Sequence, residues 1–244
     1  MKVLNGKTAA ITGAASGIGR MLSVRLAEEG CRLALADIDE TGLRETASLL
    51  DGSTPVSLHV TDVARKPEVD RFAAEAADRH GGVDLIINNA GVASMNHSLL
   101  MPAETARRLL LVNTLGTFLA SRECAKVMQR AKYGRIVNFS SVAVPLRLEG
   151  EAMYAAAKAA NEEFTRVFAR EVAGFGITCN AIGPSPIPTD LIRNVPRDRI
   201  DALVGRLAIK RLGSKEDLWP VVSFLTSAEA GYITGQVIYL GGVG

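Results

Sequence analysis

Short apolar runs alternate along this chain with longer stretches of helical periodicity, and no other feature restricts its possible folds as strongly. The apolar runs show little polar alternation, which is typical of parallel strands covered by helices on both faces. Because crossovers between parallel strands are right-handed, this order predicts a doubly wound, seven-stranded parallel sheet flanked by helices. The strand candidates are residues 8–12, 32–37, 56–60, 85–88, 135–139, 178–182 and 237–240. The helix candidates are residues 18–29, 41–50, 66–80, 103–130, 152–173 and 215–226.

Composition and charge fit one α/β domain spanning residues 1–244. The 28 basic and 26 acidic residues are spread along the chain, so we expect no nucleic-acid partner. No segment approaches the roughly 18 apolar residues of a membrane span, and the first apolar run is too short for a signal peptide. These features predict no membrane association and a cytoplasmic location. The three cysteines are widely spaced and lie near no histidine cluster, so we expect reduced core thiols and no metal site.

A glycine-rich turn, Thr12-Gly13-Ala14-Ala15-Ser16-Gly17-Ile18-Gly19, joins the first strand candidate to the first helix candidate. Glycines let backbone N–H groups approach a pyrophosphate, and the helix N-terminus offers unpaired donors. Such a turn can also do no more than join a strand to a helix. Directly after a strand, it predicts a Rossmann-type dinucleotide site. The expected cofactor-binding residues of this turn are Gly13, Ser16, Gly17, Ile18 and Gly19.

Asp37 ends the second strand candidate, 18 residues beyond Gly19. A carboxylate there can accept hydrogen bonds from both ribose hydroxyls of an adenosine and would repel a 2′-phosphate. Ser16 also leaves the turn without a basic residue for that phosphate. The pattern therefore favours NAD over NADP, although Asp37 could be an ordinary strand-end carboxylate.

Further motifs follow in order along the chain. They are Asp62-Val63, Asn88-Asn89-Ala90-Gly91, Asn113, Ser141 and Tyr154-Ala155-Ala156-Ala157-Lys158. With the glycine turn, they make the chain resemble the short-chain dehydrogenase/reductase family from residue 7 to residue 242. The resemblance is strongest to the branch that contains the 3-oxoacyl-acyl-carrier-protein reductases.

This resemblance implies roles for residues along a bound cofactor. Asp62 would accept a hydrogen bond from the adenine amino group, and the Val63 backbone would meet the ring. Asn89, Ala90 and Gly91 would run along the cofactor. In the later loop, Pro184 matches the family's Pro-Gly motif, Ser185 replaces the usual glycine, and Ile187 and Thr189 would contact the nicotinamide carboxamide.

Tyr154 and Lys158 lie four residues apart on a predicted helix, hence on one face. An unperturbed phenol has a pKa too high for a base at neutral pH, and a nearby ammonium is expected to lower it. Tyr154 is therefore the predicted general acid/base for hydride transfer at an alcohol or carbonyl carbon. Ser141, with Ser140 as the competing candidate, would stabilise the substrate oxygen. By resemblance, Lys158 reaches the nicotinamide ribose and Asn113 holds a water of a proton relay.

The substrate is expected to be a small carbonyl or alcohol compound. Several arginines near the predicted pocket could orient an anionic group, or could form a solvated helix face. They are Arg147, Arg193, Arg197, Arg199 and Arg206. Two alternatives remain open, an NADPH-dependent 3-oxoacyl-acyl-carrier-protein reductase and a cofactor-binding protein without turnover. The apolar helices 103–130 and 152–173 suggest a homotetramer or homodimer.

Overall fold

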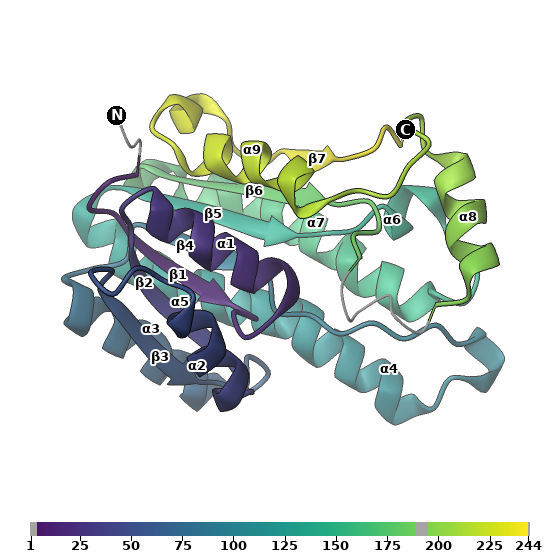
Figure 1. The fold of residues 1–244 in the computed structure, drawn as a ribbon, viewed down its shortest axis with the longest axis horizontal. Coiled ribbons are helices and arrows are strands. Elements are labelled where there is room, and N and C mark those ends of the chain that lie inside the picture. The colour runs from purple at the N-terminus through teal and green to yellow at the C-terminus, as the bar shows by residue number, and fades with distance from the viewer. Residues whose placement is uncertain (1–3, 189–194, 244) are drawn as a thin grey trace.

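A single seven-stranded parallel sheet organises the molecule (Figure 1). The computed structural model describes residues 4–188 and 195–243. The strands are β1 (Thr8–Thr12), β2 (Arg32–Asp37), β3 (Val56–Val60), β4 (Leu85–Asn88), β5 (Gly134–Phe139), β6 (Ile177–Gly183) and β7 (Val237–Tyr239). Their order in the sheet is β3-β2-β1-β4-β5-β6-β7, and every pairing is parallel. The predicted doubly wound sheet is confirmed.

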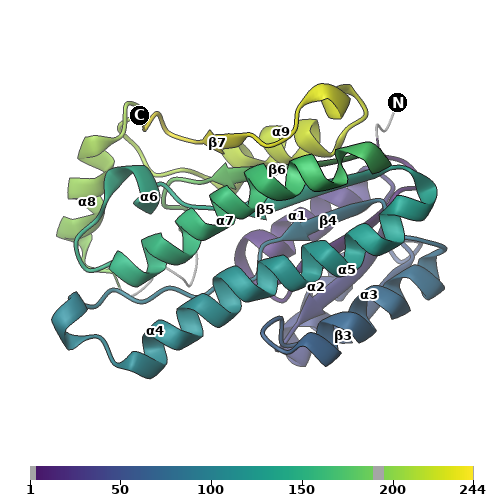
Figure 2. The same ribbon diagram turned by 180° about the vertical axis from the view of Figure 1, so that it is seen from behind.

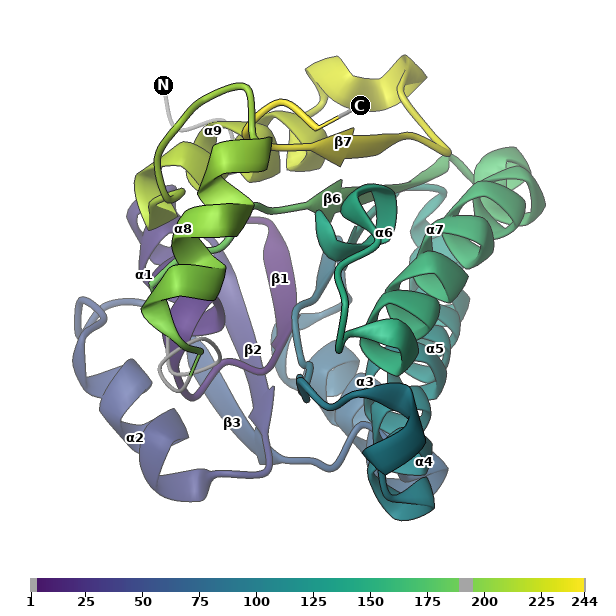
Figure 3. The same ribbon diagram turned by 90° about the vertical axis from the view of Figure 1, so that its right-hand side faces the viewer.

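Helices cover both faces of this sheet, as the end-on view in Figure 3 shows. One face carries α1 (Gly17–Glu28), α2 (Glu40–Ser48) and α9 (Lys215–Thr226). The other carries α3 (Lys66–His80), α5 (Gly116–Ala131) and α7 (Ala152–Val172), which are prominent in Figure 2. Each face has its own buried apolar cluster, with Leu22, Leu35 and Val222 in one and Phe72, Ile86 and Met128 in the other. Burial on both faces explains why the strands read as continuous apolar runs.

The strand order reverses between β1 and β4, because β2 and β3 lie on one side and β5 to β7 on the other. In open α/β sheets, this reversal leaves a crevice beyond the carboxyl ends of the strands, where ligands bind. Three short helices gather at that end of the sheet, α4 (Ala103–Leu110), α6 (Ala143–Leu146) and α8 (Arg197–Arg206) (Figure 1). The fold thus predicts the position of a site before any side chain is considered.

The prediction of a single helix over residues 103–130 is wrong in one respect. A π-helical turn, η2 (Leu111–Leu115), separates α4 from α5. The sequence did not reveal it, because residues 111–115 contain no glycine or proline that would mark an irregular turn. Helices α6 and α8 were also missed. Within residues 4–188 and 195–243, the remaining short turns are the 3₁₀ segments η1 (Ser98–Leu100), η3 (Ala173–Phe175) and η5 (Glu229–Tyr232).

Candidate active site

The glycine turn forms the floor of a cleft of about 650 Å³ at the strand reversal. Gly13 has a φ of 69°, and a Cβ there would lie 2.8 Å from the Cα of Ala90. A Cβ on Gly19 would lie 2.0 Å from the Gly13 carbonyl oxygen. Gly19 therefore packs behind the turn and is not part of the cleft wall, whereas Gly13, Ser16, Gly17 and Ile18 line it. Only glycines at positions 13 and 19 allow the turn and α1 to approach this closely.

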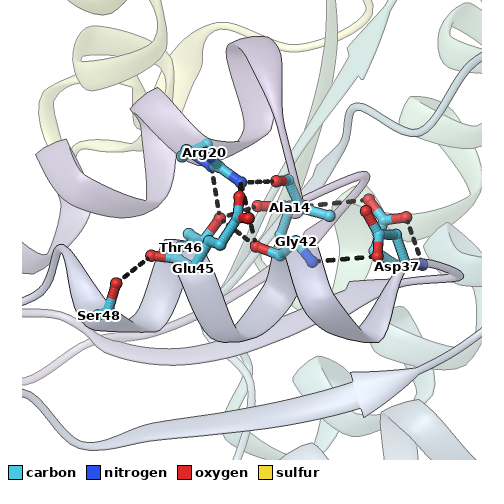
Figure 4. Close-up of polar contacts among 9 residues, drawn as sticks. Ala14, Arg20, Asp37, Gly42, Glu45, Thr46 and Ser48 are labelled. Carbon is cyan, nitrogen blue, oxygen red and sulfur yellow. Dashed lines mark hydrogen bonds and ion pairs between the residues drawn. The ribbon is translucent and has the colours of Figure 1, made fainter.

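Asp37 lies beside this turn, at the end of β2. Its Oδ2 accepts a hydrogen bond from the Ala15 backbone N–H at 3.0 Å, and its Oδ1 accepts one from Asp39 N–H at 3.1 Å. Figure 4 shows the carboxylate next to the turn and Arg20 directed instead toward α2. Arg20 pairs there with Glu45 at 2.7 Å and also donates to the carbonyl oxygens of Ala15 and Gly42. The Arg20 guanidinium therefore connects α1 to α2.

The far wall of the cleft comes from the ends of β3 and β4. Asp62 Oδ1 accepts from the Ala64 N–H at 2.9 Å, which fixes the carboxylate at the cleft edge beside Val63. Asn89 Nδ2 donates to the carbonyl oxygens of Thr12 and Gly13 at 3.1 and 3.0 Å. These bonds join the β4 end to the glycine turn. The cleft thereby brings together the predicted residues Gly13, Ser16, Gly17, Ile18, Asp37, Asp62, Val63, Asn89, Ala90 and Gly91.

Asn113 is fully buried in the π-helical turn. Its side chain accepts from the Val92 N–H at 3.0 Å and donates to the Val92 carbonyl at 2.8 Å. A Cβ on Gly91 would lie 2.9 Å from Asn113 Oδ1 and 3.5 Å from Lys158 Nζ. Asn113 therefore holds the segment after β4 against the lysine, while the water that the resemblance assigns to it stays a prediction.

Ser140 and Ser141 face different surroundings after β5. Ser140 is buried, and its hydroxyl donates to Glu162 Oε1 at 2.5 Å. Ser141 lines a second pocket, of about 110 Å³, together with Tyr154. The Ser141 hydroxyl lowers the pKa of the Tyr154 phenol, although burial outweighs this effect. Geometry therefore favours Ser141 over Ser140 as the residue beside a reacting oxygen.

Tyr154 and Lys158 share a face of α7, as their spacing predicts. Lys158 Nζ lies 5.8 Å from the Tyr154 ring centroid and donates to the Phe139 carbonyl oxygen at 3.0 Å. Burial lowers the pKa of Lys158 to about 8. The expectation that this ammonium lowers the pKa of Tyr154 is not met: burial raises the pKa of the phenol to about 12, and the charge of Glu151 adds to the rise. In this structure, desolvation of the phenolate is the largest cause of the shift.

Pro184 and Ile187 line the second pocket, as the resemblance implies, and Thr189 lies outside the described residues. The two pockets share Ile18 and are therefore adjacent. Sequence reasoning missed Ile38 in the first pocket and Glu151 in the second. Ile38 directly follows Asp37, so its position beside a predicted site residue could have indicated it, whereas Glu151 stands just before a helix and carries no comparable signal.

The arginines suspected of binding an anion do not line the second pocket, as far as the structure describes them. Arg147, Arg197, Arg199 and Arg206 are exposed, and Arg206 donates to the Leu146 carbonyl oxygen. Arg193 lies outside the described residues.

Metal sites and membrane-spanning helices are both absent from the described part of the chain. It contains no cluster of histidine, cysteine and carboxylate side chains that could hold a metal ion. Among the helices of residues 4–188 and 195–243, none combines the length and apolar character needed to cross a membrane.

Comparison with known proteins identifies relatives over nearly the whole chain. The family model described as enoyl-(acyl carrier protein) reductase matches residues 13–242. The 3-oxoacyl-[acyl-carrier-protein] reductase FabG of Vibrio cholerae is 34% identical over 241 residues, covering 98% of this chain and 97% of that protein. A short-chain type dehydrogenase/reductase of Picea abies is also 34% identical, covering 98% and 92% of the two chains. The crystal structure of levodione reductase superposes with a TM-score of 0.92 at 29% identity, covering 98% of this chain and 97% of that one.

A doubly wound sheet with a Tyr–Lys pair beside a dinucleotide cleft defines a class of oxidoreductases that transfer hydride at CH–OH and carbonyl groups. The chain belongs to the short-chain dehydrogenase/reductase family, in the branch that resembles the 3-oxoacyl-acyl-carrier-protein reductases. The resemblance inferred from the motifs is confirmed.

Proposed function

We propose that this protein uses NAD(H) to interconvert a small carbonyl compound and its alcohol, with Tyr154 as the general acid/base. The observation that carries the proposal is that the two pockets are adjacent and share Ile18. The cleft with the glycine turn and Asp37 lies beside the pocket that contains Ser141 and Tyr154.

The residues present fit a nicotinamide dinucleotide. Gly13 and Gly17 leave the N-terminus of α1 open to the cleft, where backbone N–H groups and the helix dipole favour a pyrophosphate. Ser16, Ile18 and the 89–91 segment would flank it. A bound dinucleotide would supply or accept the hydride, and Lys158, Pro184, Ile187 and Thr189 would hold its nicotinamide end.

Charge around the cleft supports NAD over NADP. Three carboxylates, those of Asp37, Asp62 and Glu104, line the cleft, and Arg108 is the one basic side chain among its described lining residues. A 2′-phosphate beside Asp37 would meet a carboxylate, the Ser16 hydroxyl and the apolar Ile38 side chain. Arg20 is already paired with Glu45. A free ribose hydroxyl, in contrast, could donate to Asp37.

The protonated state of Tyr154 suits the direction of carbonyl reduction. A phenol with a pKa of about 12 carries its proton at neutral pH and can donate it to the substrate oxygen as the hydride arrives. The Ser141 hydroxyl would donate a hydrogen bond to the same oxygen and stabilise its developing charge. Lys158 is positioned by the Phe139 carbonyl, and its amine would assist return of the proton to Tyr154.

Cofactor choice is tested by initial rates of carbonyl reduction with NADH and with NADPH. We expect kcat/KM to favour NADH by roughly tenfold or more, because a hydrogen bond to a charged group contributes about 1.5–3 kcal/mol. Asp37→Ser should lower the ratio of kcat/KM with NADH to kcat/KM with NADPH. Asp62→Ser is the matched control, because it removes a carboxylate of the same cleft that the proposal places at the adenine, and it should leave the ratio unchanged. Faster rates with NADPH would instead support an NADPH-dependent 3-oxoacyl-acyl-carrier-protein reductase. Several relatives of this chain are 3-oxoacyl-acyl-carrier-protein reductases.

The acid/base role is tested by Tyr154→Phe. We expect kcat/KM to fall by about 10²–10⁴-fold with little change in NADH affinity, because the phenyl ring keeps the packing and loses the proton. Fluorescence titration of NADH checks the affinity. Full activity in this variant would refute the mechanism. Normal NADH binding by the parent with no turnover of any carbonyl or alcohol would favour the cofactor-binding alternative.

Cytoplasmic location, an uncharged or anionic substrate, and assembly as a homodimer or homotetramer remain predictions. The exposed apolar side chains Leu110, Leu115 and Val167 lie on or next to α4, α5 and α7 and support the last of these.

A further inference from the structure

The pocket beside Tyr154 is almost entirely apolar. Apart from Ser141 and Tyr154, its described lining includes only two polar side chains, Ser185 and Glu151; the remaining positions are Ile18, Ala93, Met95, Val142, Ala143, Leu148, Pro184, Pro186, Ile187, Val195 and Leu203. The Ser185 hydroxyl lies against Gly213, where a Cβ would approach it to 2.6 Å. Glu151 is therefore the one acidic side chain among these lining residues.

Glu151 is the N-cap residue of α7, and its backbone fixes it in place. Its N–H donates to the Leu148 carbonyl at 3.2 Å, and its carbonyl oxygen accepts from the Ala155 N–H at 2.7 Å. Asp, Asn, Ser and Thr commonly cap a helix at this position, but the Glu151 side chain makes no capping hydrogen bond. Within residues 4–188 and 195–243, no side chain forms an ion pair or hydrogen bond with its carboxylate.

Two pKa shifts agree with the position of this carboxylate in the pocket lining. Burial raises the pKa of Glu151, so its charge is incompletely solvated. Its charge also contributes to the raised pKa of Tyr154, so the two side chains are close. A substrate held by Tyr154 would therefore lie within reach of a carboxylate that lacks a described partner.

We propose that Glu151 is a substrate-recognition residue that selects compounds carrying a hydrogen-bond donor, an ammonium or a hydroxyl, near the reacting carbon. A donor group would give the carboxylate the partner that the described chain does not provide. An anionic group in the same place would be repelled by it. This inference rests on the proposed function. It predicts a cationic or neutral donor group on the substrate, whereas the nearby arginines suggested an anionic group.

The test uses four alcohols of one skeleton, CH₃–CH(OH)–CH₂–X, with X an ammonium, hydroxyl, methyl or carboxylate. These are 1-amino-2-propanol, 1,2-propanediol, 2-butanol and 3-hydroxybutyrate. Two quantities are measured, kcat/KM for oxidation with NAD⁺ and the dissociation constant of each alcohol from the NADH-loaded protein by calorimetry. Both are compared in the parent, in Glu151→Gln and in Glu149→Gln. The last removes a neighbouring exposed carboxylate and is the matched control.

In the parent we expect a donor-bearing alcohol to bind most tightly and 3-hydroxybutyrate most weakly. Glu151→Gln should reduce the preference for the ammonium over the methyl compound roughly tenfold and improve 3-hydroxybutyrate, because the carboxylate charge is gone. Glu149→Gln should keep the parent's ratios. If Glu151→Gln weakens binding of 1-amino-2-propanol more than binding of 1,2-propanediol, the recognised group is an ammonium. If it weakens binding of the diol more, the recognised group is a hydroxyl.

Equal ratios in the parent and Glu151→Gln, or a parent preference for 3-hydroxybutyrate, would overturn the inference. If 2-butanol is oxidised while the ratios stay equal, the inference fails and the proposed function stands. If no carbonyl or alcohol is turned over, the proposed function fails, and the calorimetric ratios alone decide the role of Glu151.

Discussion

Two adjacent serines after β5 carry the same chemical group, and their surroundings divide their roles. Ser141 lies in the pocket beside Tyr154, whereas Ser140 donates to Glu162, a buried carboxylate that Tyr239 also contacts. We expect Ser141→Ala to lower kcat/KM by about 10²–10³-fold, as does loss of one donor to a developing oxyanion. Ser140→Ala should leave kcat/KM within roughly tenfold and lower the free energy of unfolding by about 1–3 kcal/mol, because it leaves Glu162 with one donor fewer. Steady-state kinetics and urea denaturation of both variants measure this. The reverse pattern would assign the catalytic hydroxyl to Ser140.

At the same scale, the sequence was informative about identity and uninformative about electrostatics. Helical spacing paired Tyr154 with Lys158, and the resemblance to the family selected Ser141. It could not give the pKa of the phenol, because that depends on how completely the fold removes Tyr154 from water. It also could not single out Glu151, since an acidic residue just before a helix usually indicates a helix terminus and no more.

Among the elements, buried strands were the most predictable. The bounds of β1 to β4 agree with the sequence prediction, because β1, β2 and β4 are buried along nearly their whole length and each of the four strands ends at a turn or a polar residue. The C-terminal half of the site was less predictable. Helix α6 has four residues and contains Pro145, too short for any period to show, and α8 is rich in charged residues with no buried face. The substrate pocket depends on these segments, so its shape required the structure.

The π-helical turn was invisible in the sequence and still has a clear function in the fold. It places the Asn113 carbonyl oxygen where Asn161 Nδ2 from α7 donates to it at 2.8 Å and Thr117 Oγ1 donates at 2.8 Å. Asn113 thereby connects the segment after β4 to the helix that carries Tyr154 and Lys158. A regular α-helix would rotate Asn113 away from Val92, because each residue advances about 100° around the axis. A local irregularity of this kind often marks a functional site.

At the scale of the whole molecule, the free energy of unfolding should record the burial of Lys158. The pKa of this amine is about 8 in the folded chain and near its ordinary value of 10.5 when unfolded. Between these values the unfolded chain binds one proton more, so stability rises with pH. Below about pH 8 the amine is protonated in both states, and the folded state carries the full cost of burying the charge.

Lys158→Met removes that cost and keeps much of the side-chain volume. We expect the variant to be more stable than the parent near neutral pH and the difference to shrink by roughly 1.4 kcal/mol per pH unit between about pH 8 and 10. Urea denaturation of both proteins across that range measures it. The buried thiols Cys31, Cys124 and Cys179, whose pKa burial raises to about 12, change stability in the opposite direction at high pH, but they do so equally in both proteins and cancel in the difference. A stability difference that stays constant with pH would contradict this expectation. It would mean that the Lys158 amine has its ordinary pKa in the folded chain and is exposed to water at the nicotinamide site.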